Sequence, residues 1–322
     1  MVGDPARSPF DPIHLRRSGE LRRMSIEPRD GAWHPVRHGV WMAESKWALL
    51  DPIDRHAALV HAASLTQRGK KPLLFNLQSS AAIWGLPRIE RWPGVVRHLV
   101  VRRGQRGNSL IRPHLGPESE SVERQGLLVT PVARTVVDLA RFDTIHNSVA
   151  AADYALRHGL CSRAELTAEI AGLPRGSRGL PRARTVVDLA DPLSMSPGES
   201  LSRTKMFLLR LPRPQLQVAY HDDRGLIGAV DFNWDGVIGE FDGRTKYAVP
   251  EGATPEEAAQ VLWQEKQRED RLRRHPKVTD FARWVWADAM TQRRLLVVLT
   301  AAGITPDPRN TWIDLGSART RE

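Results

Sequence analysis

The sequence predicts an α/β protein in an α+β arrangement with two folded parts, and three observations indicate this. At 322 residues the chain is long enough for two hydrophobic cores. Helical and strand patterns both recur along it, and the first part is predicted to be mostly helical with a small β-ribbon. Pro, Ser and Gly concentrate in DPLSMSPGES at 191–200, which is typical of a domain boundary.

Composition excludes several classes of protein. Hydrophobic residues make up 41% and charged residues 26% of the chain, as in ordinary globular proteins. The sequence has no long apolar run and no signal-peptide pattern, so we expect a cytoplasmic protein without a membrane segment. One cysteine, Cys161, excludes a disulfide framework and zinc sites built on paired cysteines. Without a glycine-rich phosphate loop, no nucleotide cofactor is expected.

The positive charge lies in the first part. Residues 1–190 hold 28 Lys and Arg against 18 Asp and Glu, whereas residues 191–322 hold 19 of each. This asymmetry predicts that the first part contacts a polyanion, most simply DNA. The alternative is the arginine preference of a GC-rich genome, since only seven of the 47 basic residues are lysine.

The chain is predicted to begin with a polar arm over residues 1–30, because prolines and arginines interrupt any helical period there. GAWHPVRHGVWM then indicates the small β-ribbon, with its turn at Gly39. A helix is expected over 51–68, with Asp51 as its N-cap and Pro52 at its first position.

The remainder of the first part is predicted as two strands and several helices. VVRHLVVRR indicates a strand that ends in Arg102 and Arg103, which we expect to contact nucleic acid. LLVTPVARTVVDLARF indicates a strand and then a helix, and NSVAAADYALRHG and SRAELTAEIAGL indicate two more helices. The decapeptide PVARTVVDLA at 131–140 returns as PRARTVVDLA at 181–190. Because the flanks differ and no third copy exists, we expect two similar packing helices.

The second part is predicted to fold over residues 195–302, followed by a tail at 303–322. The expected elements are a helix at 199–210, strands at 215–221, 228–234 and 236–242, a long charged helix at 254–274, a strand at 278–286 and a last helix at 287–302. That order of helix, β-meander, helix, strand and helix is typical of an α/β sandwich.

The stretch VDFNWDGVIGEFDGRTKY carries the candidate chemistry. Asp231 ends one predicted strand and Glu240 lies in the next, so both carboxylates can meet at one rim of the sheet. Mg²⁺ or Mn²⁺, which assists phosphodiester hydrolysis, prefers such oxygen ligands. Lys246 is placed to stabilise charge or orient water, and Gln217 either reaches this site or is a solvated strand residue. The stretch predicts a nuclease centre in which Asp231, Glu240 and Lys246 are catalytic.

Several blocks of the second part resemble a known domain. SPGESLSR, LPRPQLQV, GAVDFNWDGVIGEFDGRTKY, EKQREDRLR and FARWVWAD follow the order of endonuclease-like domains related to very-short-patch repair nucleases, in the PD-(D/E)XK superfamily. The resemblance covers about residues 195–300 and implies a restriction-endonuclease-like fold around a mixed sheet. It implies a metal site formed by Glu199, Asp231, Glu240 and Asp242. A strict E-x-K motif has lysine where Asp242 stands, so either Lys246 takes that role or no residue does.

The first part is similar, over about residues 30–190, to proteins that resemble abortive-infection (AbiE-type) antitoxins. The matching runs are RHGVWM, SSAAIWGLP and LLVTPVARTVVDLARF. In those relatives a winged-helix segment before the GVW ribbon binds promoter DNA. Here the segment before Gly39 lacks a clear pair of helices. The resemblance therefore implies a basic DNA-binding region at 31–190 whose reading element is either shortened or lost, and it leaves a toxin partner open.

The candidate residues also have structural interpretations. Glu199 stands in capping-box spacing after Ser196, where it would bond back to the Ser196 amide. Asp231 can lie on a solvated strand face, and Asp242-Gly243 is common turn chemistry. Four arginines of the long helix are candidates for phosphate contacts, but interleaved acids would equally make an exposed face of ion pairs. They are Arg268, Arg271, Arg273 and Arg274.

Two hypotheses follow for the whole chain. In the first, it is a metal-dependent DNA endonuclease whose basic first part holds DNA. In the second, it is a non-enzymatic, antitoxin-like DNA-binding regulator with a degenerate nuclease fold. The carboxylates favour the first hypothesis. The missing E-x-K lysine and the resemblance of the first part favour the second.

Overall fold

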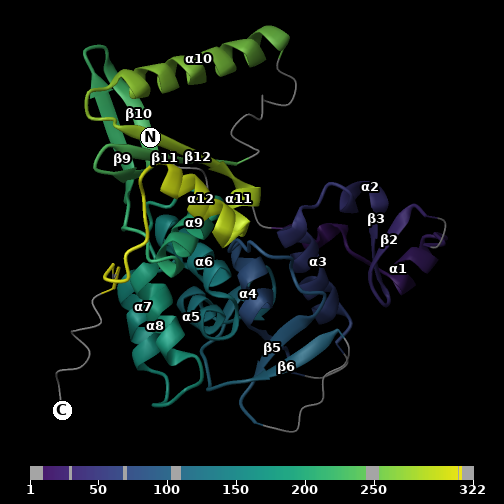
Figure 1. Ribbon diagram of the computed structural model, residues 1–322. Helices are drawn as coiled ribbons and strands as arrows, with labels where there is room; N and C mark the ends of the chain where they lie inside the picture. The colour runs from purple at the N-terminus through teal and green to yellow at the C-terminus, as the bar shows by residue number, and fades with distance from the viewer. Residues whose placement is uncertain are drawn as a thin grey trace. The chain divides into compact units, whose positions relative to one another are not determined.

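The computed structural model describes residues 10–28, 31–67, 71–102, 110–243, 254–310 and 312–313. The chain divides into two compact units, unit 1 (Met1–Val187) and unit 2 (Asp188–Glu322). Both combine helices with sheets, so the predicted α+β class is confirmed (Figure 1). Lys246 and Arg103 lie outside the described residues.

Unit 1 begins with a small three-stranded sheet. Its strands are β1 (Arg16–Arg17), β2 (Trp33–Arg37) and β3 (Val40–Ala43), in the order β1-β3-β2, and helix α1 (Ser18–Arg23) follows β1. Gly39, with a φ of 81°, permits the tight turn between β2 and β3. The ribbon predicted around this glycine is therefore present, with a third strand added from the N-terminal segment.

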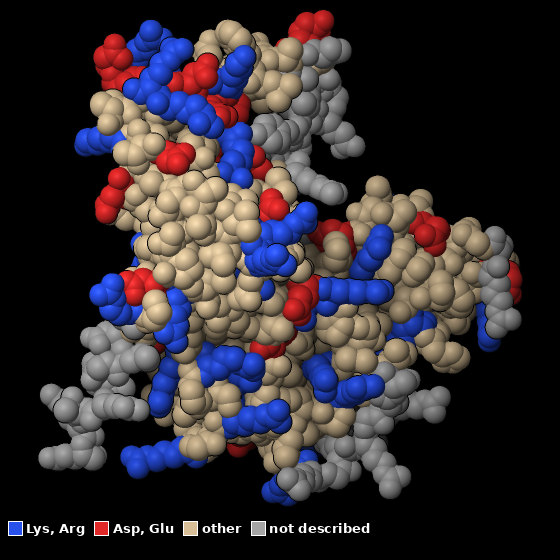
Figure 2. Space-filling view, viewed as in Figure 1, with Lys and Arg blue, Asp and Glu red and all other residues tan. Residues whose placement is uncertain are grey.

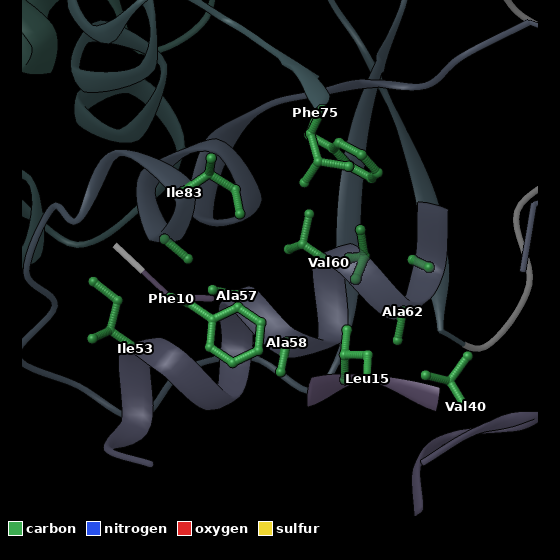
Figure 3. Packing of buried hydrophobic residues seen from close by; sticks show 14 of the residues in the cluster. Phe10, Leu15, Val40, Ile53, Ala57, Ala58, Val60, Ala62, Phe75 and Ile83 are labelled. Carbon is green, nitrogen blue, oxygen red and sulfur yellow. The ribbon is translucent and has the colours of Figure 1, made fainter. Parts of the chain in front are cut away.

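The described residues before β2, which were predicted as part of a loose or partly ordered polar arm, form short elements that pack on a hydrophobic core. Phe10 and Leu15 lie in the same apolar cluster as Val40 of β3 and Ala57 of α3 (Pro52–Leu65), as Figure 3 shows. Leu21 of α1 is fully buried. Burying one such side chain contributes about 1.5–3 kcal/mol, so a few apolar residues fix a segment that is polar in composition.

A second sheet of five strands follows α2 (Glu44–Trp47) and α3. Its strands are β4 (Leu74–Phe75), β5 (Val96–Val100), β6 (Ile111–Leu115), β7 (Val122–Arg124) and β8 (Leu127–Val129), in the order β6-β5-β4-β8-β7. The pairs β5–β6 and β4–β8 are parallel. The strands predicted in VVRHLVVRR and at the start of LLVTPVARTVVDLARF are present as β5 and β8, whereas β4, β6 and β7 were not predicted, because strands this short show too little alternation.

Five helices complete the fold around these sheets. They are α4 (Leu77–Trp84), α5 (Val132–Phe142), α6 (Ile145–Arg157), α7 (Arg163–Ala171) and α8 (Leu180–Leu189). Ser162 and Glu165 form a capping box at the start of α7. The two copies of the repeated decapeptide form α5 and α8, so both are helices as predicted.

Unit 2 is built on a four-stranded mixed sheet. Its elements are α9 (Pro197–Leu208), β9 (Gln215–Asp222), β10 (Gly225–Trp234), β11 (Val237–Asp242), α10 (Pro255–Arg274), β12 (Asp280–Val285), α11 (Trp286–Met290) and α12 (Gln292–Ala301). The strand order is β12-β11-β10-β9, with β11 and β12 parallel. The element order is the predicted one, except that the last helix is two, because Thr291 between them is extended.

Helices cover both faces of this sheet (Figure 1). Phe241 of β11 lies against α9, where a Cβ added to Gly198 would come within 2.0 Å of its ring, and it packs edge-on against Trp286 of α11. Its neighbour Glu240 faces α10 and pairs there with Arg268. Strand alternation thus places Phe241 and Glu240 on opposite faces of the sheet.

Charge is distributed differently over the two units. Figure 2 shows Lys and Arg predominating over the region of α5 to α8, whereas Lys and Arg interleave with Asp and Glu over α10. Among the helices that the structure describes, none is both long and apolar enough to cross a lipid bilayer.

Candidate metal centre

A hollow of about 610 Å³ lies between α10 and the sheet of unit 2, and three of the predicted acids line it. Asp231 comes from β10, and Glu240 and Asp242 come from β11. Glu265 and Arg268 line it from α10. Glu240 and Asp242 reach the same hollow because they alternate with Phe241 along the strand.

Asp231 is built into the sheet. The pairing of β10 with β11 ends at Phe232 and Gly239, which places Asp231 opposite Glu240 at the next position. Oδ2 of Asp231 accepts a hydrogen bond from the Phe241 amide at 2.9 Å, so the side chain takes an N–H that a continued ladder would use. Only 7% of Asp231 is exposed. The alternative of a solvated strand face is therefore wrong for this residue.

Gln217 joins Asp231 to Glu199. Its Nε2 donates to Glu199 Oε2 at 3.2 Å and to Asp231 Oδ1 at 3.4 Å. Gln217 has a φ of 52°, a left-handed conformation that is unusual for a strand residue without glycine's freedom. Such strain persists where the surroundings impose it, and it concentrates at functional sites. The structure thus brings Gln217 to the candidate site.

Glu199 both caps α9 and reaches the site. Its Oε2 accepts from the Met195 amide at 2.8 Å, and its Oε1 accepts from the Ser196 hydroxyl at 2.8 Å. The predicted bond to the Ser196 amide is replaced by the bond to Met195. The side chain is buried and takes part in the cap, whereas its role as a metal ligand stays a prediction, because Glu199 does not line the hollow and is joined to Asp231 through Gln217.

Two arginines hold Glu240. Its Oε1 accepts from Arg268 Nη2 at 2.7 Å, and its Oε2 accepts from Arg283 Nη2 at 3.1 Å. Arg283 stands beside Glu240 in the parallel register of β11 and β12, and it also pairs with Asp242 at 3.3 Å. Glu240 is 4% exposed, so this carboxylate is buried with its charge matched by guanidinium groups.

The side chain of Arg268 is held in place by several contacts. Its Nη2 also donates to the Ala229 carbonyl at 2.8 Å, and its Nη1 pairs with Glu265 at 3.0 Å. A Cβ at Gly228 would lie 2.8 Å from Arg268 Nε, so only glycine at this position leaves room for the arginine side chain. Burial acts to lower the pKa of Arg268, but its bond to Glu240 and the charges of Glu240 and Glu265 raise that pKa above its ordinary value.

The residue types in the hollow fit a hard divalent cation. Carboxylate oxygens of Asp231, Glu240 and Asp242 are the ligands that Mg²⁺ and Mn²⁺ prefer. Over the described part of the chain, no three His, Cys, Asp or Glu side chains are arranged to hold a metal ion as they stand. Glu240 accepts one hydrogen bond from an arginine on each oxygen, and each oxygen keeps a second lone pair, so a metal ion bound there would have to tolerate or displace the neighbouring guanidinium charges.

The predicted nucleic-acid contacts lie in different environments. Arg268 and Arg271 of α10 point to the sheet, where the hydrogen bond from Arg271 lowers the pKa of Asp222 to about 2. Arg273 pairs along the helix with Glu269 at 2.8 Å, as the ion-pair alternative predicted. Arg274, near the end of α10, and Arg102, after β5, are exposed.

Three contributors to the site were not predicted from the sequence. Arg283 could have been found from the sequence. It lies between Ala282 and Trp284 in a strand, so its side chain must lie on the face opposite these two buried apolar residues. No sequence signal pointed to Gly198 and Gly228, because their role is to leave space for the side chains of Phe241 and Arg268.

Comparison with known proteins adds similarity without an activity. No family model matches the chain. Two proteins of Mycobacterium tuberculosis, from strains CDC 1551 / Oshkosh and ATCC 25618 / H37Rv, are each 29% identical to it over 218 residues, which is 66% of this chain and 74% of each relative. Both are named as uncharacterized proteins. The nuclease and antitoxin resemblances therefore stay predictions.

Proposed function

We propose that the chain is a metal-dependent DNA endonuclease whose centre lies in the hollow under α10. One observation carries the proposal: Asp231, Glu240 and Asp242 line a single hollow, and Gln217 ties Asp231 to Glu199. Acids gathered in one hollow, with arginines and amide donors that hold them in place, are typical of functional sites, which supports the proposal.

The residues of the hollow have distinct proposed roles. Asp231 and Glu240 would hold Mg²⁺ or Mn²⁺, with Glu199 and Asp242 completing or orienting the shell. The bound ion would activate water and neutralise charge on the phosphate. Gln217 fixes the orientation of Asp231. Arg268, once released from Glu240, stays at the wall of the hollow, where its fork suits phosphate oxygens.

The DNA is proposed to contact unit 1 as well. The excess of basic residues in the first 190 residues supports this, because a positive surface attracts the phosphate backbone. Arg102 is exposed and suited to such a contact. Lys246 stays the predicted partner of the scissile phosphate.

A second candidate function is a DNA-binding regulator that uses the nuclease-type fold without catalysis. The observation that favours it is the double pairing of Glu240 with Arg268 and Arg283, which already compensates the carboxylate without a metal. In this case α10 would be fixed to the sheet by ion pairs, and the hollow would have no catalytic role.

Plasmid cleavage separates the two candidates. The full chain is incubated with supercoiled plasmid and Mg²⁺ or Mn²⁺, beside Asp231→Asn and the matched control Asp235→Asn. Asp235 is an exposed residue of the same hairpin with a φ of 48°, which asparagine tolerates. Cleavage by the wild type and the control, lost in Asp231→Asn, supports the endonuclease. DNA binding without metal-dependent cleavage by the wild type supports the regulator.

A further inference from the structure

The small sheet of unit 1 contains a second hollow of about 610 Å³, and its charge is opposite in sign to that of the first. Arg22 of α1, Arg37 of β2 and His38 of the following turn line it, with Glu27 as the one acidic residue in its lining. Trp41 of β3 and Ser18 of α1 form a wall, joined by a hydrogen bond from the indole N–H to the hydroxyl at 2.9 Å.

Arg37 is the informative residue of this hollow. Its Nη1 is buried and has no hydrogen-bond partner among the described residues. Burial lowers the pKa of Arg37 below its ordinary value, and no compensating contact offsets that effect. A buried guanidinium nitrogen without an acceptor costs free energy, whereas the rest of this half-buried side chain lines the hollow, where an anion would offset its charge.

The backbone places Arg37 there. The pairing of β2 with β3 shifts register between Pro35 and Arg37, and such an irregularity re-aims a side chain. Gly39 then turns the chain so that His38 and Trp41 border the same space. The arginine is thus directed into the hollow by the fold of the ribbon.

We infer that this hollow binds a phosphate group. A guanidinium fork matches two phosphate oxygens, and Arg22 and His38 add positive charge or donors from neighbouring positions. The volume exceeds that of one phosphate and leaves room for the group attached to it. The phosphate comes from free phosphate or from a DNA backbone. The inference does not depend on the proposed nuclease centre, because it concerns unit 1 alone.

The test compares four forms of the full chain by isothermal titration calorimetry. They are the wild type, Arg37→Gln, Arg22→Gln and the control Arg23→Gln. Arg22 is exposed, so its replacement leaves folding intact, and Arg23 is an exposed neighbour on α1 that does not line the hollow. The probes are inorganic phosphate, with chloride at equal ionic strength as blank, and a short DNA duplex.

We expect phosphate affinity to fall at least about tenfold in Arg37→Gln and Arg22→Gln and to stay unchanged in Arg23→Gln, as loss of a charge-assisted bond predicts. If phosphate alone gives no heat, the same pattern with the duplex supports a backbone phosphate as the ligand. Equal affinities in all four forms, an equal loss in Arg23→Gln, or failure of the wild type to bind either probe would overturn the inference.

Discussion

Burial affects basic groups differently in the two units. Among the described residues of unit 1, burial is the largest influence on seven basic side chains and lowers the pKa of each: Arg37, His56, His61, Arg97, His98, His114 and Arg141. In unit 2 burial acts on Arg268 too, yet bonds to Glu240 and Glu265 raise its pKa. Unit 1 therefore has a hollow in which a cation lacks a partner, and an anion suits it. In unit 2 Glu240 is already paired with Arg268 and Arg283, so a metal ion must compete with these arginines for the carboxylate.

The largest loss of stability is expected on replacing Asp138, a buried counter-ion of two arginines in unit 1. Asp138 of α5 is 1% exposed and pairs with both Arg134, at 2.8 Å, and Arg141, at 3.1 Å. Asp138→Ala would leave two buried guanidinium groups without it and lower the free energy of unfolding of unit 1 by about 3–5 kcal/mol.

The matched control is Asp188→Ala, at the same position of the second decapeptide. Asp188 is exposed, so its loss should change stability by less than about 0.5 kcal/mol. Chemical denaturation followed by circular dichroism measures both substitutions. Equal effects would show that the burial of Asp138 has no energetic consequence.

Acid should weaken unit 1 through His56. Burial, with a smaller effect of Arg88, lowers its pKa from 6.5 to about 4 although Pro93 O accepts from the ring. Near pH 7 the ring is neutral in both states. As the pH falls from 6.5 towards 4, His56 takes up a proton in the unfolded chain but not in the folded chain. The full effect lowers the free energy of unfolding by about 3 kcal/mol.

The measurement is urea denaturation at pH 7 and at pH 4.5 for the wild type and for His56→Gln. Between these two pH values the free energy of unfolding should fall by about 2 kcal/mol more in the wild type than in His56→Gln, since glutamine takes up no proton. The same loss in both proteins would mean that His56 is accessible to protons in the folded state.

Metal should stabilise unit 2 if the proposed function is right. At a hundredfold excess of Mg²⁺ over its Kd, the expected gain is about 2.7 kcal/mol, seen as a rise in Tm. Asp231→Asn should remove this gain, whereas Asp235→Asn should keep it. A wild type whose Tm does not respond to Mg²⁺ or Mn²⁺ would contradict a metal site in this hollow.

The smallest effect concerns competition between arginine and metal. Arg268→Gln frees one oxygen of Glu240 from a cation, so we expect Mg²⁺ to bind about tenfold more tightly by calorimetry. Arg273→Gln is the control, because Arg273 pairs with Glu269 and does not line the hollow. Unchanged or weaker binding in Arg268→Gln, in a wild type that does bind Mg²⁺, would show that Arg268 supports the metal site.

Much of unit 2 followed from local patterns. Capping at Ser196 indicated the start of α9, and the alternation around Phe241 predicted the face shared by Glu240 and Asp242. The contacts of Gln217 and Arg283 with the acids were not predictable in the same way. They depend on strand register and on a left-handed backbone at one residue, which no short window of sequence specifies.

The repeated ARTVVDLA separates what the sequence alone determines from what the tertiary structure determines. Both copies are helices, and Val136 and Val186 at matching positions are fully buried, because helix propensity and apolar spacing are local properties.

The charged residues of the two copies differ in environment. Arg134 is 4% exposed, with Glu169 and the carbonyls of Pro117 and Glu118 as further partners, whereas Arg184 is exposed. Burial of a charge requires acceptors from other segments, and only the tertiary structure brings those to one copy and leaves the other in water.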